Sequence, residues 1–378
     1  MDFTLDETQG AVAGLAAEVL RREVDYGRAE RSLAGGPGYD ETLWKAMAHA
    51  GLLALAVPED LGGEGLGVLE TALVLAEVGR HAAAVPALAT LGLGVLPLSR
   101  LGTGEQRGEL LPPVVEGDAV LTAALNEPSS PLSATPATTA READGGYLVG
   151  GVKVGVPYAT SAHRILVPAM VEPSGTGVLL VDPKAAGVDL RRTPTSSGAP
   201  EYRIRLDDAW VPAADLLGGD TTGAVAAGLR RLAVAGGCAV ADGALDGALA
   251  LTAAHVRTRE QFGRPLAAFQ AVAQQVADVY VTARTLHLAA WSACWRLAAG
   301  RDTDGDLDVA ALWAAEQATS ALHTCHHLHG GLGMDASYPL HRHYSLVKDL
   351  ARFLGGVEAS LDRLGEWTAK GSIGCSSS

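Results

Sequence analysis

Apolar positions follow two different spacings along the 378 residues of this chain. Up to residue 118, and again after residue 218, they recur every three or four residues, as in amphipathic helices. Between these segments the chain changes to short runs of aliphatic and β-branched residues, which Gly, Pro, Ser and Asp separate. The pattern predicts an α+β protein with an N-terminal helical domain (1–118), a middle β-barrel domain (119–218) and a C-terminal helical bundle (219–370).

The same periodicity places the individual elements. Strands are expected over residues 120–124, 146–149, 164–168, 177–181 and 202–206. A loop rich in Ser, Pro and Thr is expected over 129–140, and a disordered tail over 371–378. Helices are expected over 7–22, 41–50, 67–78 and 82–100 in the first domain, and over 221–257, 266–300, 309–329 and 344–363 in the last. Helices as long as these last four predict an antiparallel four-helix bundle.

The composition narrows the class of protein. The net charge of -14 disfavours a nucleic-acid partner, because phosphate binding needs a basic surface. The four cysteines are widely separated and the acidic N-terminus has no signal-peptide pattern, so we expect free thiols and a cytoplasmic protein. The longest uncharged run, residues 82–99, contains two prolines and two glycines, and this favours a buried, interrupted helix over a membrane span.

Two segments at the ends of predicted helices carry candidate binding chemistry. Residues 257–265, Arg-Thr-Arg-Glu-Gln-Phe-Gly-Arg-Pro, concentrate positive charge, an amide and an aromatic ring in an acidic chain. Residues 326–333, His-His-Leu-His-Gly-Gly-Leu-Gly, offer glycines that let backbone N–H groups approach an anion closely. Together they indicate a site for a pyrophosphate and a stacked heterocycle. No metal site is expected, because helical spacing spreads the neighbouring histidines over different faces and residues 323–329 include no carboxylate.

These motifs resemble those of the acyl-CoA dehydrogenase family. Arg-Glu-Gln-Phe-Gly-Arg-Pro (259–265) is followed by Phe269-Gln270, and Gly-Gly-Leu-Gly (330–333) by Tyr338-Pro339. The likeness covers the whole chain and is strongest after residue 225. It implies an FAD-dependent enzyme that introduces an α,β double bond into an acyl-CoA thioester. In the family a carboxylate removes the α proton, flavin N5 accepts the β hydride, and an electron-transferring flavoprotein is the usual electron acceptor.

The resemblance also assigns cofactor-binding residues. In the family these two segments of one subunit hold the ADP part of an FAD whose ring lies in the neighbouring subunit. By that match Arg259 pairs with the pyrophosphate, because its planar fork donates two parallel hydrogen bonds, and Gln261 and Phe262 contact the ADP end. The remaining contacts implied by the match are His327, Gly330, Gly331 and Gly333.

The carboxylate base of the family is absent at both matching positions. The base is usually a Glu that follows the Tyr-Pro motif, where this chain has Leu354. A minority of members place it on an earlier helix, where this chain has Arg230. Neither side chain accepts a proton at neutral pH. Glu358 is the carboxylate nearest to Leu354 and is the alternative base.

The flavin-ring segments also depart from the family pattern. Glu127-Pro128 is kept, but the Gly-Ser that follows is lost and Pro131 intrudes. Gly155 replaces the Trp that covers the isoalloxazine, and Pro157, which has no backbone N–H, replaces a hydroxyl-bearing residue. By the resemblance, this chain does not hold a flavin ring of its own.

The losses affect the site for the chain's own flavin ring, whereas the ADP-side motifs remain. We therefore expect an α2β2 assembly with a homologous subunit that carries the catalytic Glu. The chain resembles one subunit of the actinobacterial heterotetrameric members of the family, which act on steroid side-chain CoA thioesters. Two alternatives stay open: a non-catalytic scaffold that stabilises a partner or binds acyl-CoA, and a self-sufficient homo-oligomeric dehydrogenase with an unrecognised base.

Overall fold

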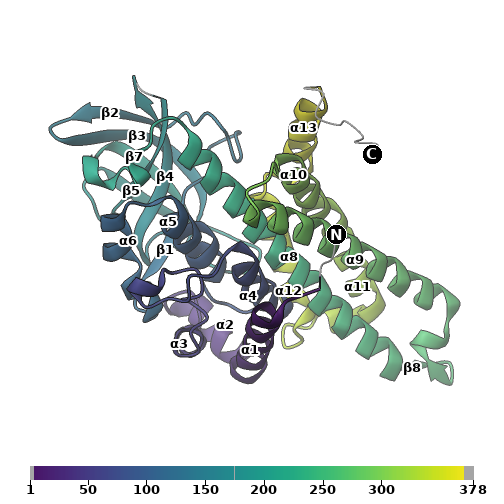
Figure 1. Cartoon of the computed structure of the whole chain (residues 1–378). Helices are drawn as coiled ribbons and strands as arrows, with labels where there is room; N and C mark the ends of the chain where they lie inside the picture. Colours follow the sequence, from purple (N-terminus) through teal and green to yellow (C-terminus); the bar gives the residue numbers. More distant parts are fainter. Residues whose placement is uncertain (1–3, 174, 370–378) are drawn as a thin grey trace.

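A computed structural model describes residues 4–173 and 175–369 of the chain (Figure 1). The predicted tail, with Cys375, lies outside these described residues. Within them, α-helices lie before residue 116 and after residue 223, and the strands of one mixed sheet lie between Val120 and Pro212. The α+β class predicted from the two periodicities is therefore confirmed.

The first three helices begin at acidic N-cap residues. Asp6, Asp25 and Asp40 precede α1 (Glu7–Glu23), α2 (Tyr26–Gly35) and α3 (Glu41–His49), and each carboxylate accepts the N–H of the residue three positions later. The periodicity does not predict α2, because Ala29 is its only buried residue. The next helices are α4 (Val68–Arg80), a π-helical segment (Leu88–Val95), α5 (Leu96–Leu101), α6 (Gly104–Leu110) and α7 (Pro112–Val115). The helix predicted over 82–100 thus begins six residues later than expected.

The middle of the chain forms a seven-stranded sheet in the order β1-β4-β2-β3-β7-β6, with β5 paired to β4. Five strands overlap the predicted runs, whereas β2 and β6 were not expected, because both consist largely of exposed polar residues. β2 also begins inside the segment expected to be a loop. The strands are β1 (Val120–Ala123), β2 (Thr139–Ala143), β3 (Gly146–Pro157), β4 (Ala162–Glu172), β5 (Gly175–Val181), β6 (Val188–Thr193) and β7 (Glu201–Pro212).

The C-terminal helices are organised around α8 (Ala224–Thr258), which has 35 residues and is therefore about 50 Å long. α8 runs from the sheet to the opposite end of the molecule, where the short strands β8 (Glu260–Gln261) and β9 (Arg264–Pro265) form a hairpin (Figure 1). α4, α9, α11 and α12 pack along it. The later helices are α9 (Gln270–Ala298), α10 (Asp304–Leu312), α11 (Ala318–His329), α12 (Leu340–Phe353) and α13 (Gly356–Ala369).

The single helix predicted over 344–363 is wrong. Gly355 and Gly356 have φ values of 95° and 77°, in the left-handed region that glycine adopts without strain. These two residues end α12 and allow α13 to leave in a new direction. The break matters for function, because it lies beside the position where the family pattern expects a base.

α8 is also the one helix of the described residues that is long and apolar enough to cross a membrane by length and composition. In this protein 67% of its most apolar window is buried against other elements. That burial is typical of the central helix of a folded core.

Candidate functional site

The hairpin after α8 presents three of the predicted cofactor-binding residues to solvent. Arg259 is the C-cap of α8, and its carbonyl accepts the N–H of Leu266 at 2.8 Å, which closes the hairpin. Gln261 pairs with Arg264 across the two strands, so Phe262 and Gly263 form the turn. Phe262 is 92% exposed and has a φ of 53°, which is unfavourable for a residue with a side chain. An exposed aromatic ring on a strained turn is typical of a binding surface.

The glycine segment follows α11 as a short 3-10 turn, Gly330–Met334. Gly330 has φ 57° and ψ −134°, a backbone region that only glycine occupies readily. A Cβ at Gly333 would lie 3.1 Å from Nδ1 of His326, so this position also favours glycine. Gly331 has nothing within 4 Å of its missing Cβ and is exposed, so its backbone is open to a ligand. His327, on the last turn of α11, is exposed as well.

A stacked pair of imidazoles brings the two segments together. His255, one turn before Arg259, stacks on His329, the residue before Gly330, with ring centroids 4.4 Å apart and an interplanar angle of 17°. His329 is held in turn by the carbonyl oxygen of Cys325 at 2.8 Å and the hydroxyl of Tyr338 at 3.1 Å. Burial lowers the pKa of both His255 and His329, so the stack is neutral at neutral pH and repulsion does not separate it.

This end of the molecule fits the ADP part of a dinucleotide. Among the described residues no carboxylate forms an ion pair with Arg259, so its guanidinium is available to a phosphate group. Phe262 on the hairpin, and Leu332 (39% exposed) and Met334 (79% exposed) on the glycine segment, add exposed apolar surface at this end of the molecule. Exposed apolar side chains around a cation are typical of a site that a partner molecule completes.

The positions expected to carry a base hold no group that performs the task. Leu354 is fully buried and contacts the backbone of α8 at Gly237, where a Cβ would lie 3.2 Å from Leu354 Cδ2. Arg230 lies 3.6 Å from the carboxylate of Asp304, and a guanidinium has no lone pair to accept a proton. Glu358 is exposed in the first turn of α13 and lines no cavity that the structure describes.

The segment expected to face a flavin ring is packed against the end of α12 instead. Asn126 donates from Nδ2 to the carbonyl oxygen of Phe353 at 3.0 Å and accepts the N–H of Leu132 at 2.9 Å. Pro131 lies so close to Gly355 that a Cβ there would be 3.0 Å from the proline ring. Asn126 and Leu132 are 7% and 3% exposed, so this segment is buried against the end of α12.

The retained Glu127 is part of a buried ion pair. Its Oε1 accepts from Lys153 Nζ at 2.8 Å, and the two side chains are 4% and 0% exposed. Burial by itself raises the pKa of Glu127, but the hydrogen bonds from Lys153, Thr138 and Ala137 outweigh it and lower the pKa to about 2. Glu127 therefore fixes the loop that follows β1, and its low pKa makes it a poor proton acceptor.

Gly155 lies beside an ion pair that occupies the space of a larger side chain. Arg352 on α12 donates to both carboxylate oxygens of Glu201 on β7, at 2.8 and 2.6 Å. A Cβ at Gly155 would lie 3.5 Å from Nη1 of Arg352 and 3.9 Å from Cδ of Glu201. The ion pair thus lies next to the position where the family pattern has a Trp side chain. The sequence alone does not indicate this pair, because its members are 151 residues apart.

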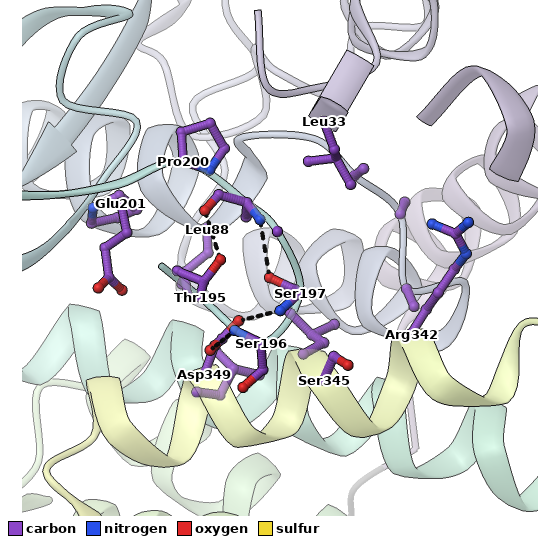
Figure 2. Close-up of a pocket in the computed structure, with 18 of the residues that line it drawn as sticks. Leu33, Leu88, Thr195, Ser196, Ser197, Pro200, Glu201, Arg342, Ser345 and Asp349 are labelled. Atoms are coloured by element: carbon purple, nitrogen blue, oxygen red, sulfur yellow. Dashed lines mark hydrogen bonds between the residues drawn. The ribbon is translucent and has the colours of Figure 1, made fainter. Parts of the chain in front are cut away.

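Gly155 and Pro157 also line a cavity of 540 Å³ between α12, the loop over 195–200 and the turn that follows α4. Figure 2 shows Asp349, Ser345 and Arg342 coming from α12, with the loop on the opposite wall. Asp349 accepts the N–H groups of Ser196 and Ser197, both at 2.9 Å, and so ties the loop to the helix. Sequence reasoning missed this cavity, since neither wall carries a recognisable motif.

The ring-side and ADP-side positions are far apart within one chain. Phe353 and Leu354 lie against Gly237, which precedes Arg259 by 22 residues of the same helix and its cap. That length of helix spans about 33 Å. The two positions therefore lie at well-separated points along α8.

Metal-binding and thiol chemistry find no support in the described residues. No group of three or more His, Cys, Asp and Glu in that part of the chain is placed to hold a metal ion. Cys238, Cys294 and Cys325 are free and buried, and burial raises the pKa of each thiol.

Known proteins resemble this chain in sequence and in structure. Residues 6–118 match the N-terminal domain of acyl-CoA dehydrogenases and residues 226–367 match their C-terminal domain. The acyl-CoA dehydrogenase FadE28 of Mycobacterium tuberculosis is 46% identical over 365 residues, which are 97% of this chain and 98% of that protein.

Two solved structures have similar folds. A chain of the ChsE4-ChsE5 complex from Mycobacterium tuberculosis superposes with a TM-score of 0.91 at 34% identity, over 98% of this chain and 99% of that chain. A variant of the Tcur3481-Tcur3483 steroid ACAD superposes with a TM-score of 0.90 at 38% identity, over 98% of this chain and 100% of that chain.

Proposed function

Because the chain belongs to the acyl-CoA dehydrogenase family, whose members are FAD-dependent oxidoreductases, we propose that it is one subunit of a hetero-oligomeric acyl-CoA dehydrogenase. In this proposal the chain binds the ADP part of an FAD whose ring lies in a homologous partner subunit. The partner also carries the catalytic Glu and binds the acyl-CoA substrate for desaturation. FAD supplies the hydride acceptor of that reaction.

The observation that carries the proposal is the contrast between the two half-sites. The ADP-side residues are exposed around Arg259, whereas the ring-side residues, near Asn126, are packed and lie about 33 Å away along α8. A chain that keeps the residues of one half-site and lacks those of the other needs a second, different chain to complete a cofactor site. Two copies of each chain then form an α2β2 tetramer with fewer active sites than subunits.

The names of two similar structures support the choice of partner and substrate. One is a complex of two differently named proteins, ChsE4 and ChsE5, and the other is a steroid ACAD with two named components. We therefore propose a steroid side-chain CoA thioester as the substrate class. From the family resemblance and the sequence, we also propose an electron-transferring flavoprotein as the electron acceptor and the cytoplasm as the compartment.

Within the proposed site, the residues of this chain bind and orient the cofactor. Arg259 pairs with the pyrophosphate, and its rigid fork fixes the direction of approach. Gln261 and Phe262 contact the ADP end at the hairpin. Gly330, Gly331 and Gly333 allow backbone N–H groups to approach the cofactor, and His327 offers an imidazole donor at the rim. The neutral stack of His255 on His329 holds the two segments next to each other.

The test is the flavin content and dehydrogenase activity of the chain purified alone and after co-expression with its candidate partner. We expect no flavin and no activity alone, and one FAD per heterodimer with activity together. One FAD per chain and activity alone would instead establish a homo-oligomeric enzyme, with Glu358 as the first residue to test as base. A stable complex without flavin would support the scaffold.

A further inference from the structure

One face of α9 exposes a continuous row of apolar side chains to solvent. Tyr280, Val281 and Leu288 are 55%, 61% and 50% exposed. The exposed Ala273 and Ala277 extend the row toward the start of the helix, at the spacing of one helix face, and the five residues together are called the α9 stripe below. The stripe is about 22 Å long. Single exposed apolar residues are normal on a protein surface, whereas a continuous row marks an interaction site.

The opposite face of α9 already belongs to the core of the helical bundle. α9 returns from the β8–β9 hairpin alongside α8 (Figure 1), and it also packs on α4, α10 and α11. The buried residues of this face include Val279, Ala283, Leu286 and Ala290. The middle of α9 is therefore apolar on both faces. Because a helix that is apolar all round is typical of a buried position, we expect the α9 stripe to be covered in the assembled protein.

Two opposite charges flank the centre of the stripe. Asp278 lies three residues before Val281 and Arg284 three residues after it, and both are exposed. Among the described residues, neither side chain forms an ion pair or a hydrogen bond, and the carboxylate of Asp242 on α8 is paired with His287 at 2.9 Å instead. Asp278 and Arg284 do not face each other within one helix, because side chains meet at spacings of three or four residues. Both charges are thus available to another molecule.

We propose that the α9 stripe binds the α9 stripe of a second copy of this chain, in an antiparallel contact centred on Val281. Such a two-fold contact is isologous, so residues equally far before and after its centre come to the same level along the helix pair. Asp278 of each copy then lies at the level of Arg284 of the other copy. The contact removes the apolar side chains from water and supplies Arg284 with the counter-charge that a covered cation needs.

The charge pattern favours a second copy of this chain as the occupant. Opposite charges at equal distances from Val281 complement themselves when the helix is reversed, so no other sequence is required. In the proposed α2β2 assembly this contact joins the two copies of this chain, whereas FAD joins each copy to its homologous partner at Arg259. The inference does not rest on the proposed function, because the contact forms without the cofactor and without the homologous partner.

The first test is the dimer dissociation constant of the full-length chain, purified alone and measured by sedimentation equilibrium. Arg284→Asp should raise this constant by about ten-fold or more, because two carboxylates then face each other across the contact. Adding Asp278→Arg to Arg284→Asp reverses both charges and should restore the dissociation constant to within about three-fold of wild type. The control is Arg191→Asp on β6, where the side chain is 80% exposed, and it should leave the constant unchanged. A monomeric wild-type chain, or no recovery in the doubly reversed variant, would overturn the proposal.

The second test locates the contact by cross-linking. Val281→Cys, in a chain that also carries Cys375→Ser, should give a disulfide-linked dimer on oxidation with diamide, because the two copies of position 281 meet at the centre of the contact. Cys238, Cys294 and Cys325 are buried and do not compete. The matched control is Leu361→Cys on α13, a 51% exposed apolar position outside the stripe, which should remain unlinked. A covalent dimer from both variants, or from neither, would contradict the proposal. Neither test measures flavin, so its outcome is independent of the test of the proposed function.

Discussion

The sharpest prediction concerns Arg259, because its only expected role is to bind the pyrophosphate of FAD. The side chain is exposed and forms no ion pair with a described carboxylate, so Arg259→Ala should change the free energy of unfolding by less than about 0.5 kcal/mol. In the assembled complex the same change should remove a charge-assisted contact to the FAD pyrophosphate. The variant is therefore expected to weaken FAD binding without lowering the stability of the fold.

The size of the loss follows from the kind of contact. A hydrogen bond to a charged group contributes about 1.5–3 kcal/mol, and this corresponds to roughly 10- to 150-fold weaker FAD binding. Arg259 is at the end of a rigid helix, and its backbone is held by His255 and Leu266. The lost contact is thus expected to weaken FAD binding within that range.

The assay is FAD titration of the apo-complex, followed by flavin fluorescence, with the melting temperature of the chain as a check on folding. The matched control is Arg264→Ala on the same hairpin, where the guanidinium stacks over Phe269 at 4.0 Å. We expect the control to bind FAD within a few-fold of wild type. Equal FAD affinity in the Arg259→Ala complex and wild type would refute the assignment of the hairpin to the cofactor.

Two further predictions concern stability. Lys153→Met should lower the free energy of unfolding by about 3–5 kcal/mol in urea titrations, because it leaves the buried Glu127 carboxylate without its counter-ion. Adding Glu127→Gln should restore part of the lost stability. The second prediction concerns the pH dependence of stability. Burial lowers the pKa of His255 and His329, so below about pH 6.5 the unfolded chain binds more protons than the folded chain. The free energy of unfolding should therefore fall as the pH decreases. His255→Gln should flatten the melting temperature between pH 7 and 5.5, whereas His163→Gln, at an exposed histidine, should not; equal slopes would contradict the prediction.

Local chemistry in the sequence determined the class of fold and the family. Helical and strand periodicities are properties of neighbouring residues, so the long helices and five of the seven strands were predicted, and the family resemblance is confirmed by the matched domains. The motifs around Arg259 and Gly330 are equally local. The replacement of a base by Leu354 is also visible in the sequence, although its meaning rests on the family pattern.

Contacts between distant residues were decided only by the tertiary structure. The stack of His255 on His329 joins two helix ends, and the Glu201–Arg352 pair fills the space beside Gly155; neither has a signal in spacing or composition. The break at Gly355 was missed because a glycine within a helical pattern gives no φ value by itself. The distance between the two half-sites and the 540 Å³ cavity beside α12 depend on how α8 and α12 pack, which no local pattern specifies.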